Sequence, residues 1–392
     1  MRKAETLVTP RFMLVVLAGL LYFTALGMLL PVVPLYVEDR LGGGAAEVGI
    51  AVGSLFIGAV LLRPYVGRVG DRIGRRVLII GGAFVVAVST ALSGLVAALP
   101  FLVGVRLVTG LGEAAFFVGA ATMVTDLAPA TRRGEAVSYW SVAIYGGLAA
   151  GPALGELVLG DDRFGLVFLV AAGIALGAAL LGLGTAEVER PEAGPTSGPL
   201  WNRAALGPGA VLFLGLAGLA AFLAFARLYA DDLGMAGAES VFLLYGGLVL
   251  VVRIVGARLP DVLGPQRAGT GALVTTAAGM AVMGAWRSPT GLLVGTAVFA
   301  AGMSLLYPAL LLLALDAAPD AERASVVGTF SSFFDLSQGL GALMLGGVAE
   351  LAGYRGAFVA AAGLALVGLV VLRGGMRDRV ATSAHPAETL PA

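Results

Sequence analysis

The sequence contains no cysteine and a single histidine, His385. Disulfides, thiolate metal sites and cysteine nucleophiles are therefore excluded. Most hydrolase and metalloenzyme mechanisms are excluded for the same reason. The 25 Lys and Arg residues are balanced by 25 Asp and Glu residues, so no basic excess is available for binding nucleic acid. Charged residues make up 13% of the chain and hydrophobic residues 58%, against roughly 25% and 45–50% in soluble domains. This composition indicates a membrane protein with no metal and no cofactor.

Long apolar runs occur throughout the chain. A bilayer core of about 30 Å needs roughly 20 apolar residues per helix. Twelve runs of about this length are present, so we predict an all-α membrane protein with twelve transmembrane helices and only short loops and tails. The predicted spans are residues 12–37, 46–66, 77–98, 101–124, 136–159, 164–184, 206–230, 240–259, 268–286, 290–315, 324–350 and 358–372.

The distribution of positive charge predicts the orientation, because cytoplasmic loops are enriched in Lys and Arg. With both termini in the cytoplasm, most of these residues fall on the cytoplasmic side. The arginines left outside are Arg40, Arg163, Arg227, Arg287 and Arg355. The outer loops carry acidic pairs instead, such as Glu38 and Asp39. We therefore predict a multi-pass protein of the cell inner (plasma) membrane.

The chain repeats itself at one fixed spacing. Seven identities stand at this spacing: Arg63, Asp71, Gly74, Asp126, Pro129, Arg133 and Gly151 match Arg253, Asp261, Gly264, Asp316, Pro319, Arg323 and Gly341. The repeat predicts two six-helix bundles in parallel topology, residues 1–184 and 206–392, with a binding site between them near the bilayer midplane. Residues 185–205 are polar and include three prolines, which indicates a mostly extended cytoplasmic linker.

The loop between the second and third spans, residues 67–76, reads GRVGDRIGRR. Its glycines, Gly67 and Gly74, allow a tight turn, and its arginines can pair with acids on other helices. This loop resembles the motif G-x-L-a-D-r-x-G-r-[KR] of the major facilitator superfamily. Residues 256–267 carry a weaker copy. The twelve spans, the repeat and the linker resemble that family as well, so the resemblance covers almost the whole chain and implies the major facilitator fold.

In that family the loop is a conformational latch, which braces the two halves in the outward-open state. The resemblance implies this role for seven residues: Gly67, Asp71, Arg72, Gly74, Arg75 and the partners Asp126 and Asp335. Asp335 supports the role independently. It lies about three turns into the eleventh span, where an unpaired carboxylate is costly, so we expect an arginine partner.

The fourth span contains two ionisable residues, Arg106 and Glu113. They are seven positions apart, so they lie on nearly the same face of the helix. Ionisable residues at this depth indicate function, and a static ion pair is the alternative. The run resembles the R-x-x-x-G-x-G motif of the family's fourth helix, with a departure at Thr109, where glutamine is common. The resemblance implies that Arg106 and Glu113 take part in proton coupling, and we expect Glu113 to be the main protonation site.

The fifth span contains Gly147, Gly151, Pro152 and Gly155. Such a pattern favours close helix packing and a proline kink. It also resembles the motif G-x-x-x-G-P-x-x-G-G of exporters that work as proton antiporters, with Glu156 in place of the last glycine. The matching stretch of the second half, residues 337–342, lacks the proline. The resemblance therefore implies the twelve-helix drug/proton antiporter branch and favours export over uptake.

In the major facilitator fold the first, fourth, seventh and tenth helices line a central cavity. The candidate lining residues on these helices are Tyr22, Phe116, Phe117, Phe222, Phe225, Arg227, Phe299, Met303 and Tyr307. Side chains of this kind also serve as packing, which is the alternative role. Together they indicate a mostly apolar cavity for hydrophobic or amphipathic compounds. A sugar site would need several amides, and Asn202 is the only asparagine in the chain.

The leading hypothesis is a secondary active transporter: a monomeric, proton-coupled antiporter that exports small hydrophobic or amphipathic compounds by alternating access. The alternative is a proton-coupled symporter that imports a small metabolite, and a third possibility is a transporter-like sensor or scaffold. We expect no enzyme, because the spans offer no nucleophile–His pair and no metal cluster. Lys3, the sole lysine, cannot supply a nucleotide-binding loop. The expected partners are a small-molecule substrate, protons and the lipid bilayer, with no nucleic acid.

Overall fold

The computed structural model describes residues 7–129, 132–160, 162–185, 201–256, 259–319 and 322–383. Lys3, His385 and residues 186–200 of the predicted linker lie outside these ranges. The described residues form helices and no strand. The helices are α1 (Pro10–Leu35), the π-helix η1 (Tyr36–Arg40), α2 (Ala45–Ile73), α3 (Arg75–Ser93), α4 (Leu99–Asp126), α5 (Arg133–Leu159), α6 (Phe164–Leu183), α7 (Arg203–Asp232), α8 (Glu239–Val255), α9 (Leu259–Leu263), α10 (Pro265–Ala285), α11 (Pro289–Asp316) and α12 (Arg323–Ser383).

Ten helices in the described part of the chain are long and apolar enough to cross a membrane. One of them, α12, is interrupted at Gly353, where φ is 69°, and its two segments supply the eleventh and twelfth predicted spans. Helix α8 has 17 residues and supplies the eighth span. The prediction of an all-α membrane protein is therefore confirmed, although α8 ends at Val255, before the predicted end of the eighth span at residue 259.

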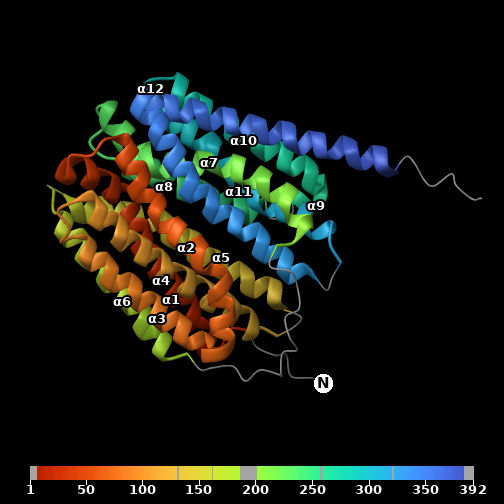
Figure 1. The fold of residues 1–392 in the computed structure, drawn as a ribbon, viewed down its shortest axis with the longest axis horizontal. Coiled ribbons are helices and arrows are strands. Elements are labelled where there is room, and N and C mark those ends of the chain that lie inside the picture. The colour runs from red at the N-terminus through yellow and green to blue at the C-terminus, as the bar shows by residue number, and fades with distance from the viewer. Residues whose placement is uncertain are drawn as a thin grey trace, which may run out of the picture.

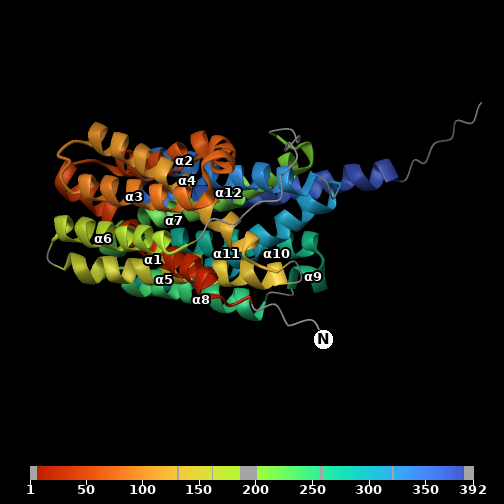
Figure 2. The ribbon, with the colours of Figure 1, turned by 90° about the horizontal axis from the view of Figure 1, so that it is seen from below.

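The helices run roughly along the long axis of the molecule in both views (Figures 1 and 2). Helices α1 to α6 lie in the lower part of the bundle in Figure 1, and α7 to α12 in the upper part. The first residues of α4 and α11 are separated by the same number of positions as Arg63 and Arg253, and so are their last residues. The helices therefore repeat at the spacing found in the sequence. The predicted arrangement of two six-helix halves is confirmed.

In each half, a glycine with positive φ separates two successive helices at equivalent positions of the repeat. Gly74 (φ 96°) separates α2 from α3, and Gly264 (φ 82°) separates α9 from α10. Only glycine adopts such angles without steric cost. The expectation that Gly67 also takes part in the turn is wrong, because α2 continues through it to Ile73.

Small residues bring the two halves into contact along two pairs of helices. Between α2 and α12, a Cβ atom added to Gly346 would lie 3.0 Å from the Cα atom of Gly49. Between α5 and α8, a Cβ atom added to Gly246 would lie 2.6 Å from the Cα atom of Ala149. Lipid is as apolar as these helices, so their association depends on close van der Waals packing rather than on removal of apolar surface from water.

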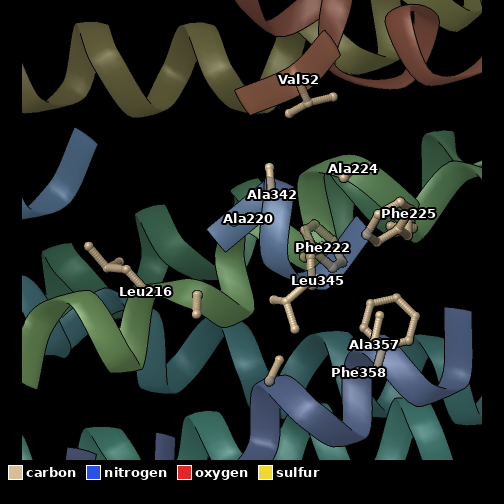
Figure 3. Close-up of a cluster of buried hydrophobic side chains, with 14 of the residues drawn as sticks. Val52, Leu216, Ala220, Phe222, Ala224, Phe225, Ala342, Leu345, Ala357 and Phe358 are labelled. Carbon is tan, nitrogen blue, oxygen red and sulfur yellow. The ribbon is translucent and has the colours of Figure 1, made fainter. Parts of the chain in front are cut away.

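Helix α7 packs against both segments of α12 in the core of the second half. Figure 3 shows Phe222 and Phe225 of α7 gathered with Leu345 and Phe358 of α12, and all four are almost completely buried. Val52 of α2 belongs to the same cluster, so the core extends across the contact between the halves.

Candidate functional site

A buried cluster of three charged side chains joins the two halves. Arg63 of α2 lies between Glu113 of α4 and Asp335 of α12. Its Nη2 atom donates to both carboxylate oxygens of Glu113, at 3.3 Å and 3.1 Å, and its Nε atom lies 2.9 Å from Oδ2 of Asp335. The exposed fractions of the three side chains are 12%, 9% and 3%. One arginine therefore holds a carboxylate of its own half and a carboxylate of the other half.

Aromatic side chains surround this charged cluster. The guanidinium carbon of Arg63 lies 4.9 Å from the ring centroid of Phe117, which is within the range of a cation–π interaction. Tyr22 is completely buried and interacts electrostatically with Glu113 and Arg63. Tyr307 interacts electrostatically with Arg63 and Asp335. Water is largely excluded, so the charges in the cluster interact strongly.

The structure does not pair Arg106 with Glu113, which contradicts the alternative of a static ion pair between them. Arg106 is buried, and its Nε atom donates to the carbonyl oxygen of Ala51 at 3.0 Å. Seven residues of α-helix span about 10 Å along the axis, so the two side chains stand on the same face but at different depths. The partner of Glu113 is Arg63, from a different helix.

The latch residues are only partly brought together. Arg75 forms an ion pair with Asp126, and both belong to the first half. Asp335 has the arginine partner that we expected, but the partner is Arg63 rather than a residue of the loop. Arg72 is exposed, and the side chain of Asp71 lies outside the described part of the structure. In this conformation the carboxylate of Asp335 is occupied by Arg63.

Most of the predicted cavity residues are packed inside their own half. The side chains with no exposed surface are Tyr22, Phe116, Phe222, Phe225 and Phe299. Tyr22 stacks on Phe116 with ring centroids 3.8 Å apart, and Phe222 packs on Phe299 at 5.5 Å. The assignment of these five to a cavity surface is wrong for this conformation. Met303 is also buried, whereas Phe117 and Tyr307 keep some exposed surface.

The glycine and proline residues of the predicted antiporter motif hold α5 against α1. A Cβ atom added to Gly151 would lie 2.6 Å from the Cα atom of Gly27, and one added to Gly147 would lie 2.7 Å from the backbone nitrogen of Thr24. Gly155 approaches Met28 in the same way, and Pro152 lies inside α5 near Gly27. Both helices belong to the first half, so the motif sets the packing inside that half.

Three polar contacts join the halves at the end of the bundle where the predicted outer loops lie. Glu156 of α5 lies 2.8 Å from Nε of Arg227 in α7, and Arg227 also pairs with Asp231. Tyr354 donates its hydroxyl hydrogen to Glu38. In the third contact the backbone N–H of Ala46 donates to Oε2 of Glu350 at 3.3 Å. Arg227, predicted in the cavity, thus belongs to an ion pair at this end.

Three residues of the site are not predicted for it from the sequence: Arg63, Tyr145 and Arg253. The charge of Arg63 counts toward the predicted cytoplasmic side, although the residue lies inside the predicted span 46–66. Its recurrence as Arg253, in the middle of predicted span 240–259, is the signal that could have found both. The guanidinium carbon of Arg253 in α8 lies 3.8 Å from the ring centroid of Tyr145 in α5, so this arginine also joins the two halves.

The chain is similar to known proteins over most of its length. The profile of the Major Facilitator Superfamily matches residues 15–285 and 248–390. An uncharacterised MFS-type transporter of Salmonella typhimurium (strain LT2) is 31% identical over 372 residues, which cover 91% of this chain and 94% of that protein. The uncharacterised MFS-type transporter YhhS of Escherichia coli (strain K12) is 26% identical over 375 residues, which cover 92% and 91%.

Two solved structures have the same fold. A bacterial homologue of the human lysosomal transporter Spinster, in an inward-facing and occupied conformation, matches with a TM-score of 0.77 and 16% identity, covering 94% of this chain and 98% of that one. The nucleoside transporter NupG matches with a TM-score of 0.74 and 16% identity, covering 93% and 98%.

Proposed function

The chain belongs to the Major Facilitator Superfamily and is a multi-pass membrane transporter, and from this premise we propose that it is a proton-coupled antiporter. It exports small hydrophobic or amphipathic compounds by alternating access. The moving bodies are the two bundles, residues 1–184 and 206–392, and the chain acts as a monomer with both termini in the cytoplasm. The three contacts at the outer-loop end support an inward-facing conformation.

The observation that carries the proposal is the sharing of Arg63 between Glu113 and Asp335. With both carboxylates ionised, the cluster has two negative charges and one positive charge. A single proton makes it neutral, and a neutral cluster is less costly in a site that excludes water. Protonation also removes half of the attraction that holds Arg63 in place. The cluster is therefore suited to taking up and releasing one proton in each cycle.

The position of the cluster links the proton to the movement of the halves. Arg63 and Glu113 belong to the first half and Asp335 to the second. A proton on Asp335 weakens the ion pair across the interface, while a proton on Glu113 leaves Arg63 paired with the opposite half alone. The strength of the contact between α2 and α12 thus depends on which carboxylate carries the proton. A proton can shift a conformational equilibrium only if it interacts differently with the two conformations, and this contact supplies such a difference.

Export is supported by Gly147, Gly151 and Pro152, which resemble the antiporter motif. These residues pack against α1. Export is also supported by the apolar, aromatic surroundings of the charged cluster, which suit lipophilic compounds. Uptake with a proton is the competing direction, and the two differ in the sign of the coupled proton flux.

The test is transport by the purified protein in proteoliposomes that enclose a pH-sensitive dye. A panel of amphipathic compounds is added outside, with no imposed gradient. An antiporter that takes a compound in releases protons from the lumen, so the lumen becomes alkaline, whereas a symporter makes it acidic. Acidification supports the alternative, and the absence of any proton flux together with the absence of compound flux supports a sensor or scaffold.

Two variants connect the flux to the cluster. Glu113→Gln and Asp335→Asn each keep the shape of the side chain and remove one ionisable group. We expect both to abolish the proton flux, while Arg287→Gln, which changes an exposed arginine in the loop between α10 and α11, leaves it unchanged. Proton flux of native size in both carboxylate variants contradicts the proposed role of the cluster.

A further inference from the structure

Arg253 is a second arginine at the interface of the halves, and no acid among the described residues balances its charge. It stacks on Tyr145 and interacts electrostatically with Tyr245. Its Nε atom is buried and has no hydrogen-bond partner within the described ranges. Charged groups inside a membrane protein are almost always paired, because an isolated charge in apolar surroundings is costly.

The internal repeat shows what is missing beside Arg253. Arg63 and Arg253 are equivalent in the repeat, and Arg63 has two carboxylate partners. The position equivalent to Asp335 is Tyr145, and the position equivalent to Glu113 is Met303. The repeat has therefore kept the arginine and replaced both of its counter-ions with a phenol and a thioether, neither of which carries negative charge.

The aromatic rings around Arg253 suit the apolar part of an amphipathic molecule whose charged group binds the guanidinium. Tyr145 and Tyr245 both lie near the guanidinium, and Tyr145 also interacts electrostatically with Tyr307, a third phenol group. The ring of Tyr245 in turn packs on Phe222 and Phe299, with centroids 4.8 Å and 5.7 Å apart. Arg253 and the three tyrosines all keep some exposed surface, unlike the phenylalanines behind them.

We propose that Arg253, with Tyr145, is the subsite that binds the anionic head group of the substrate, and that the substrate class is amphipathic organic acids with a carboxylate or sulfonate. The guanidinium offers several N–H donors to such a group, and paired charged hydrogen bonds of this kind are among the strongest in proteins. The apolar body of the acid lies on the aromatic rings. This proposal rests on the proposed function and gives it a substrate class.

The structural alternative is that the stack of Arg253 on Tyr145 only holds α8 against α5. The two roles differ in what they require of a ligand. A structural stack affects charged and neutral compounds alike, whereas an anion subsite distinguishes an acid from its neutral analogue.

The experiment measures equilibrium binding by calorimetry to the whole chain in nanodiscs of phosphatidylcholine. The probes are 1-naphthylacetate and 1-naphthylacetamide, which share the apolar body and differ in the charge of the head group. We expect the acid to bind about 10-fold to 100-fold more tightly than the amide, as hydrogen bonds to a charged group imply. Equal affinities, or no binding of the acid, overturn the proposal.

Variants assign the preference to this arginine. Arg253→Gln is expected to abolish the preference for the acid while the amide still binds, which shows that the site is folded. Arg253→Lys, which keeps the charge, retains part of the preference, and Arg287→Gln retains all of it. A preference that survives in Arg253→Gln overturns the proposal. So does a preference that disappears when phosphatidylglycerol is added to the nanodiscs, since a lipid head group would then be the occupant.

Failure of this subsite and failure of the proposed function are distinguishable, because binding needs no gradient. If the acid binds through Arg253 but no proton flux accompanies its transport, the proton-coupled function is wrong and the subsite stands. If proton flux accompanies transport of neutral compounds and the acid has no advantage, the function stands and the subsite is wrong.

Discussion

At the scale of single residues, the site depends on one arginine that compensates two buried carboxylates. Arg63 contacts Glu113 within its half and Asp335 across the interface. Removing one member of such a buried group leaves charge without a partner, which costs far more than the group contributes when complete. The stability of the protein should therefore respond more to breaking the cluster than to removing it altogether.

We expect Arg63→Gln to lower the free energy of unfolding by about 3–5 kcal/mol, the usual cost of breaking a buried ion pair. The triple variant Arg63→Gln, Glu113→Gln, Asp335→Asn should recover most of this loss, because no charge is then left unpaired. Thermal or denaturant unfolding in detergent measures both. If the single and triple variants are equally unstable, the loss comes from packing rather than from charge.

At the scale of the helices, glycine residues decide which faces meet. Gly147, Gly151 and Gly155 let α5 lie directly on α1, and Gly49 and Gly346 do the same for α2 and α12. These contacts lie in an apolar environment, where close approach of backbones supplies the attraction between helices. A methyl group at such a contact separates the helices, whereas the same group on a face that meets lipid does not.

We expect Gly151→Ala to destabilise the protein by about 1–3 kcal/mol, the usual cost of overpacking a close contact. The added Cβ atom would lie 2.6 Å from both the Cα atom of Gly27 and the carbonyl oxygen of Thr24. The matched control is Gly173→Ala in α6, where nothing lies within 4 Å of the added atom. Unfolding temperatures of the two variants provide the comparison, and a Gly151→Ala variant as stable as the control contradicts the packing argument.

At the scale of the whole molecule, the two halves follow one plan but differ in charge. One interface has an arginine with two carboxylates, and the equivalent place at the other interface has an arginine stacked on a tyrosine. The contacts of Glu156 with Arg227 and of Glu38 with Tyr354 join the halves at the end where the predicted outer loops lie. Alternating access requires these contacts to break while the halves move.

We expect a cross-link across this end to stop transport. The chain has no cysteine, so in the variant Ala46→Cys, Glu350→Cys only the introduced thiols react with a short bifunctional thiosulfonate. Ala46 and Glu350 are joined across the halves by a hydrogen bond of 3.3 Å. Transport in proteoliposomes should fall to background after cross-linking and recover after reduction of the link.

The matched control for the cross-link is Arg40→Cys, Asp162→Cys. Arg40 donates to the carbonyl oxygen of Asp162 at 3.2 Å at the same end of the molecule, but both residues belong to the first half. The control should transport normally when cross-linked. Undiminished transport by the cross-linked Ala46→Cys, Glu350→Cys variant shows that this end does not open.

The helix count, the repeat and the turn glycine Gly74 could be predicted from the sequence, because they follow from local rules. A bilayer of about 30 Å sets the length of each apolar run, and each helix satisfies its own backbone hydrogen bonds. The rotation of each helix could not be predicted in this way. Helices such as α4 and α11 are apolar on nearly all sides, so periodicity does not identify the face that turns inward. The cavity assignment of Phe116 and Phe222 failed for this reason.

Segment length, composition and the repeat are sufficient to predict a two-part bundle of membrane-spanning helices with ionisable residues inside it. The folded chain was needed to show that Glu113 pairs with Arg63 instead of Arg106, that Asp335 shares this arginine, and that Arg253 stacks on Tyr145. Those facts depend on contacts between helices that are distant in the chain. The interaction energy of a buried charge depends on which groups the fold places within about 4 Å of it.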